Sequence, residues 1–72
     1  MTNSLAVRNL IKERGLKLSF IAEKLKITRY CLSMKIDNRT EFKSSEIAAL
    51  CEILNVESLE QKEKLFFAQK VD

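Results

Sequence analysis

The stretch that decides the fold runs from residue 18 to residue 36 and reads LSFIAEKLKITRYCLSMKI. Its first part places Ile21 and Leu25 on one face of a short helix. Thr28 is a suitable N-cap for the next helix, because its side-chain oxygen can accept a hydrogen bond from a first-turn amide. The residues of this next helix that we expect to face inward are Cys31, Leu32 and Ile36. Two short helices joined by so brief a turn cross steeply, so the stretch predicts a helix-turn-helix over about 18–36.

Helical patterns also precede and follow this stretch. A first helix is expected to end before Gly15, which suits the left-handed conformation at a helix C-terminus. A polar turn follows at 37–40, where Asn38 can take a positive φ angle. A fourth helix carries an apolar stripe that comprises Ile47, Leu50, Cys51 and Leu54. A capping-box pattern at Ser58 predicts a C-terminal helix over about 59–69.

These patterns predict one all-α domain of five short helices over residues 1–72, because a chain of this length holds a single core. Histidine is absent, and two cysteines alone cannot form a zinc site. We therefore expect no enzyme, no catalytic residue, no metal site, no cofactor and no small-molecule substrate. The longest apolar run is 47–51, which predicts neither a signal peptide nor a membrane span. A cytoplasmic protein with Cys31 and Cys51 as reduced core thiols is expected.

The charge is unevenly distributed along the chain. Residues 1–40 hold nine basic and three acidic residues, whereas residues 41–72 hold four basic and seven acidic residues. A basic half is typical of a domain that binds a polyanion such as nucleic acid. A solvated, lysine-rich helix surface would give the same composition. Charge alone therefore leaves both interpretations open.

Residues 15–29, GLKLSFIAEKLKITR, followed by Leu32 and Ser33, resemble the Cro/CI-type (XRE-like) helix-turn-helix family of temperate-phage regulators. The resemblance continues through 47–56, IAALCEILNV, and covers about residues 5–57. It implies a lambda-repressor-like fold and a role in the switch between lysogeny and lysis in a bacterial host cell.

Several positions depart from the family pattern. The family often has glycine in the turn before the third helix, after the third helix and after the fourth, where this chain has Lys26, Asn38 and Asn55. Asparagine tolerates the left-handed conformation better than lysine does. A charged pair that often joins the first two helices of relatives is replaced by Ile11 and Phe20, which we expect to pack together in the core.

The resemblance also places Leu18 and Met34 on the surface that faces DNA, where relatives often have glutamine and another polar residue. Leucine and methionine offer a base only apolar contact, for instance to a thymine methyl. Together with Tyr30, which is expected to face outward, they form a partly apolar patch more typical of a protein interface. Alternatively, one or two of the three lie at the edge of the core.

Polar residues of the same region favour nucleic acid. Arg29 is placed to reach a guanine edge or a phosphate, and Ser33 lies one turn further along. Lys35 and Arg39 could neutralise phosphates at the far end, although a basic rim could equally dock on an acidic protein. The predicted DNA- or partner-binding residues are Leu18, Thr28, Arg29, Tyr30, Ser33, Met34, Lys35 and Arg39.

Two functions of different classes are favoured over a general structural helical bundle. A Cro-like repressor would insert the third helix into the major groove of double-stranded operator DNA. An antirepressor would use the same face to bind the phage's own repressor protein and block its DNA contacts, similar to the small modulators of repression in lactococcal-type phage switches. Leu18 and Met34 favour the antirepressor, whereas the basic N-terminal half favours DNA.

Overall fold

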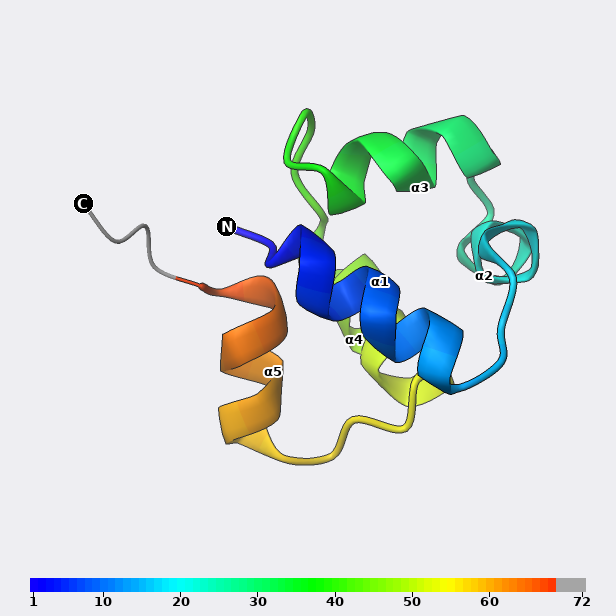
Figure 1. Ribbon diagram of the computed structural model, residues 1–72. Helices are drawn as coiled ribbons and strands as arrows, with labels where there is room; N and C mark the ends of the chain where they lie inside the picture. The colour runs from blue at the N-terminus through cyan, green and yellow to red at the C-terminus, as the bar shows by residue number, and fades with distance from the viewer. Residues whose placement is uncertain (69–72) are drawn as a thin grey trace.

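A computed structural model describes residues 1–68, and this part of the chain contains five α-helices and no strand (Figure 1). The helices are α1 (Ser4–Glu13), α2 (Leu18–Leu25), α3 (Arg29–Ile36), α4 (Ser44–Ile53) and α5 (Leu59–Phe66). The predicted all-α class with five short helices is confirmed. The C-terminal helix begins as expected but ends at Phe66 rather than near residue 69, which lies outside the described residues. Within residues 1–68, every helix is too short or too polar to cross a membrane.

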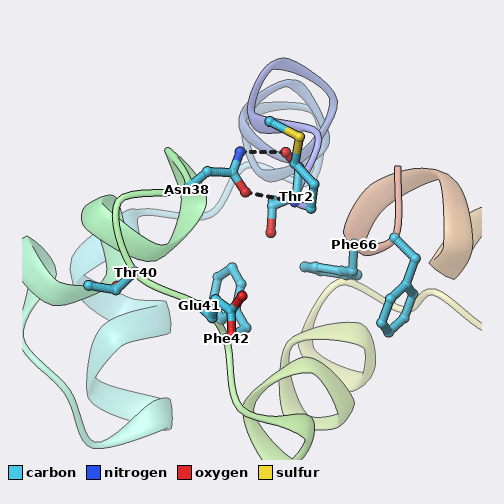
Figure 2. A pocket seen from close by; sticks show the side chains of 8 residues that line it. Thr2, Asn38, Thr40, Glu41, Phe42 and Phe66 are labelled. Carbon is cyan, nitrogen blue, oxygen red and sulfur yellow. Dashed lines mark hydrogen bonds between the residues drawn. The ribbon is translucent and has the colours of Figure 1, made fainter. Parts of the chain in front are cut away.

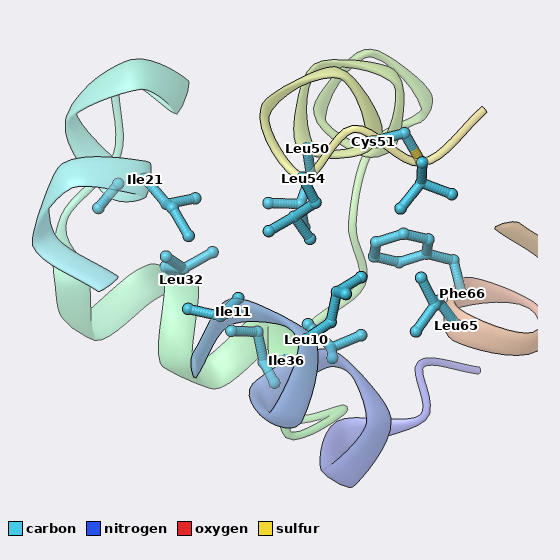
Figure 3. Close-up of a cluster of buried hydrophobic side chains, with 13 residues drawn as sticks. Leu10, Ile11, Ile21, Leu32, Ile36, Leu50, Cys51, Leu54, Leu65 and Phe66 are labelled. Carbon is cyan, nitrogen blue, oxygen red and sulfur yellow. The ribbon is translucent and has the colours of Figure 1, made fainter. Parts of the chain in front are cut away.

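One hydrophobic core joins all five helices (Figure 3). Its fully buried side chains come from α1 to α4 and the residue after α4: Val7, Ile21, Leu32, Ile36, Leu50 and Leu54. α5 adds Leu65 and Phe66. Figures 1 and 3 show that α1 and α4 lie between the α2–α3 pair and α5. The surface of α2 and α3 is therefore separated from α5 by the core.

Side-chain oxygens satisfy the free amides at the start of most helices. Asn3 accepts a hydrogen bond from the amide of Ala6, and Thr28 accepts one from the amide of Cys31 at 3.0 Å. Ser58 does the same for α5, as its capping pattern predicts. These contacts fix where α1, α3 and α5 begin, because an uncapped first turn leaves amide groups without partners.

Four residues with positive φ separate the helices. Gly15 has φ 71°, and the three positions that depart from the family's glycines, Lys26, Asn38 and Asn55, have φ 59°, 63° and 58°. Lys26 is the C-cap of α2, and only Lys26, Ile27 and Thr28 separate α2 from α3. Figure 1 views α2 end-on while α3 lies across the picture, so the two helices cross steeply as predicted.

Two predicted core residues are instead at the surface. Cys31 is exposed, because it precedes the buried Leu32 by one residue and so lies about 100° around α3 from it. Phe20 is 42% exposed rather than packed in the core with Ile11, and the Lys24 ammonium lies 5.5 Å from its ring centroid. Cys51 is buried as expected, and burial raises the pKa of its thiol.

Candidate partner-binding surface

The burial of Leu32 and Ile36 turns the opposite side of α3 towards solvent. We call this side, together with the residue that ends the helix, the α3 face; it comprises Tyr30, Cys31, Ser33, Met34 and Asp37. Tyr30 is 72% exposed, whereas Ser33 and Met34 are half-buried. Tyr30 and Met34 are one helical turn apart, so their side chains are neighbours on the surface. The expected outward position of Tyr30 is confirmed.

An arginine from α1 occupies one edge of the α3 face. The Nη2 of Arg8 donates hydrogen bonds to the Ser33 hydroxyl at 3.0 Å and to Asp37 Oδ2 at 2.9 Å, and its Nε lies 3.3 Å from Asp37 Oδ1. The side chains of Arg8 and Asp37 are 37% and 45% exposed. Sequence reasoning missed both residues, because 29 positions separate them and no local pattern links them. The Ser33 hydroxyl accepts a hydrogen bond within the protein, and its predicted contact with DNA or a partner stays a prediction.

A second ion pair lies along the other edge of the α3 face. Lys35 Nζ lies 2.9 Å from Glu46 Oε1 and also donates to the Glu41 carbonyl oxygen at 3.1 Å. The two paired side chains are only 13% and 11% exposed. Glu46 of α4 therefore already pairs with the ammonium group to which the sequence assigned a phosphate, and that role of Lys35 stays a prediction.

Two arginines remain at the ends of α3. Arg29 begins the helix and Arg39 follows it, and both are exposed. Neither side chain makes a hydrogen bond or ion pair within residues 1–68, so both can meet an external anion. Thr28 lies beside Arg29, but its hydroxyl is engaged in capping α3. Its role is thus to position the start of the helix.

Leu18 belongs partly to the core. It begins α2, is half-buried and packs against the buried cluster. The alternative in which part of the apolar patch lies at the core edge therefore applies to Leu18. Met34 is outside that cluster, which leaves Tyr30 and Met34 as the apolar centre of the surface.

A hollow of about 470 Å³ lies elsewhere, between the N-terminus, the 38–42 segment and the end of α5 (Figure 2). Three aromatic rings line it, from Phe42, Phe66 and Phe67, and the first two meet edge to face with centroids 5.8 Å apart. Among residues 1–68, Glu41 carries the one titratable side chain in this lining.

The α3 face combines apolar and charged groups. The Tyr30 ring and the Met34 thioether lie at its centre. A cation paired with a carboxylate lies at each edge, and an exposed arginine lies at each end. Comparisons with protein-family models, curated proteins and solved structures found no match for this chain. The resemblance to phage regulators therefore stays a prediction.

Proposed function

We propose that the protein is a small helix-turn-helix antirepressor of a phage lysogeny–lysis switch, active in the cytoplasm of the bacterial host. It binds its partner repressor through the surface of α2 and α3 and blocks that repressor's DNA contacts. The observation that carries the proposal is the apolar pair Tyr30 and Met34, flanked by cations that carboxylates already neutralise. This activity requires no cofactor and no catalytic residue.

The charges beside α3 support a protein partner. DNA affinity comes largely from lysine and arginine side chains that displace counterions from phosphates. Arg8 and Lys35 flank the α3 face, but each is already paired with a carboxylate of the same chain. Protein interfaces, by contrast, are enriched in tyrosine, methionine and arginine. Tyr30, Met34 and Arg29 match that composition.

A Cro-like operator repressor is the second candidate. Arg29 and Arg39 favour it, because both are exposed at the ends of α3, where an inserted helix would meet bases and phosphates. The excess of basic residues in positions 1–40 also favours it. In this function Tyr30 and Ser33 would contribute to base recognition.

A titration into two ligands separates these functions. The protein is added separately to the repressor of the same switch and to the operator DNA, at about 50 mM and about 200 mM salt. An antirepressor forms a tight complex with the repressor and binds operator weakly and without sequence preference. Tight operator binding that falls steeply with salt would instead identify a Cro-like repressor and contradict the proposal.

Truncation of one exposed aromatic ring tests the location of the interface. Tyr30→Ala should weaken the repressor complex about tenfold or more, because exposed tyrosines at an interface centre carry much of the binding energy. Leu59→Ala is the matched control, since Leu59 is 69% exposed on α5, on the far side of the core. Equal affinities of the two variants, measured by calorimetry, would exclude α3 as the interface.

A further inference from the structure

We propose that Asp37 is a specificity-determining residue, which keeps duplex DNA off the α3 face by holding the Arg8 guanidinium in an intramolecular ion pair. This inference rests on the proposed function, in which α2 and α3 bind a protein rather than DNA. It adds a mechanism of discrimination, because a helix-turn-helix surface that binds protein must also reject the abundant nucleic acid of the cell.

Arg8 contacts Asp37 with the same paired donors that an arginine uses to bind a phosphate. Arg8 presents Nε and Nη2 to the two carboxylate oxygens of Asp37, at 3.3 and 2.9 Å. Guanidinium groups bind carboxylates and phosphates through the same paired donors. Asp37 and Ser33 occupy Nε and Nη2, so a DNA phosphate would find only the N–H groups of Nη1 open, beside a carboxylate that repels it.

The position of Asp37 suggests that its carboxylate does not stabilise α3 by itself. Asp37 is the C-cap of α3, where the unpaired carbonyl groups make a negative charge unfavourable. Arg8 offsets this repulsion by pairing with it. The helix end and the Asp37 carboxylate together place negative charge beside the Arg8 guanidinium, where it disfavours the approach of a phosphate.

The Arg8–Asp37 pair is more exposed to solvent than the Lys35–Glu46 pair. Arg8 is 37% exposed, so its guanidinium becomes accessible to an external anion once Asp37 loses its charge. Lys35 is 13% exposed and is also bound to the Glu41 carbonyl oxygen. Loss of the Glu46 charge would leave Lys35 covered, so that pair cannot control access in the same way.

The test compares two substitutions that change the net charge equally. Asp37→Asn keeps the size of the side chain but leaves Arg8 facing a neutral amide. Glu60→Gln is the control, because Glu60 pairs with Lys64 on α5 and is 79% exposed. Binding of each variant to a fluorescent DNA duplex of random sequence is followed by anisotropy, at about 50 mM and about 200 mM salt.

We expect Asp37→Asn to bind the duplex about two- to fivefold tighter than the wild type at low salt, with a salt slope steeper by about 0.9, equivalent to one added phosphate contact. Glu60→Gln should bind as the wild type does. Adding Arg8→Ala to Asp37→Asn should remove the gain. Circular dichroism verifies folding, and Asp37→Ser replaces Asp37→Asn if the latter unfolds.

Equal affinities of Asp37→Asn and Glu60→Gln would overturn the inference, because net charge alone would then explain any gain. Retention of the gain after Arg8→Ala would overturn it as well. Neither result affects the proposed function. Tight, salt-sensitive duplex binding by the wild-type protein would contradict the proposed function directly, so the two failures are distinguishable.

Discussion

Lys26 adopts φ 59° in the three-residue turn between α2 and α3. This conformation costs a residue with a side chain about 1 kcal/mol or more. The amide of Lys26 donates to the Glu23 carbonyl oxygen at 3.1 Å, and the amide of Ile27 donates to that of Ala22 at 3.0 Å. These two hydrogen bonds close the end of α2 and offset the strain, so the steep crossing forms without glycine.

Glu46 is a second residue whose contribution to the stability of the fold depends on its surroundings. Burial by itself raises its pKa, but hydrogen bonds from the Lys43 amide and the Lys35 ammonium, with both lysine charges, bring the pKa below the ordinary value of 4.5. A folded-state pKa below the unfolded value means that the carboxylate stabilises the fold above the unfolded value. This contribution is lost as the pH falls through the folded-state pKa.

Glu46→Gln should therefore destabilise the protein by about 1–3 kcal/mol near neutral pH, because the largely buried Lys35 ammonium loses the carboxylate that neutralises it and keeps only the Glu41 carbonyl oxygen. The difference from the wild type should shrink as the pH falls below 4.5. Urea unfolding at a series of pH values measures it, with Glu60→Gln as an exposed control. A difference that is independent of pH would show that the Glu46 charge is not responsible.

At the scale of elements, α2 and α3 contribute unequally to the proposed interface. Leu18 of α2 packs against the core, so Leu18→Gln would destabilise the fold as well as change the surface. Met34 of α3 lies outside the buried cluster. Met34→Gln is therefore the substitution that reports on binding with the smaller effect on folding.

We expect Met34→Gln to weaken the repressor complex about fivefold or more and to leave operator binding unchanged or improved. Glutamine removes apolar contact with a protein but can form hydrogen bonds with adenine. Parallel titrations with repressor and operator DNA measure both effects. Loss of operator binding with intact repressor affinity would remove the main support for the antirepressor.

At the scale of the whole molecule, the N-terminal segment forms hydrogen bonds both with Asn38, just after α3, and with α5. Figure 2 shows the bonds to Asn38. The Asn38 side chain accepts a hydrogen bond from the Thr2 amide and donates one to the Thr2 carbonyl oxygen, both at 2.8 Å. The next amide, of Asn3, donates to the carbonyl oxygen of Leu65 in α5 at 2.8 Å. Asn38 therefore links parts of the chain that are distant in sequence.

Asn38→Gly should lower the free energy of unfolding by about 1–3 kcal/mol, because glycine keeps the positive φ angle but loses both hydrogen bonds. Asn55→Gly is the matched control, since Asn55 has φ 58° and its side chain makes no hydrogen bond within residues 1–68. That control should be neutral or slightly stabilising. Equal effects of the two substitutions in urea unfolding would show that backbone conformation alone matters at Asn38.

The helices, the turns and much of the core followed from local patterns in the sequence. Apolar spacing and N-caps such as Thr28 act within one or two turns of chain, so the positions of α2 and α3 were predictable. Positive φ at Asn38 and Asn55 followed from residue type. The burial of Cys31 and Phe20 was predicted wrongly, because helical spacing alone defines the buried face of a short helix only within a residue or so.

The electrostatics of the candidate surface depends on how the helices pack together. The sequence indicated that Tyr30 and Met34 face outward, but it presented Lys35 and Ser33 as free to bind DNA. Packing of α1 and α4 against α3 brings Arg8 to Ser33 and Asp37, and Glu46 to Lys35. These partners lie 11 to 29 positions apart, so their pairing depends on how the helices pack and leaves no local pattern in the sequence.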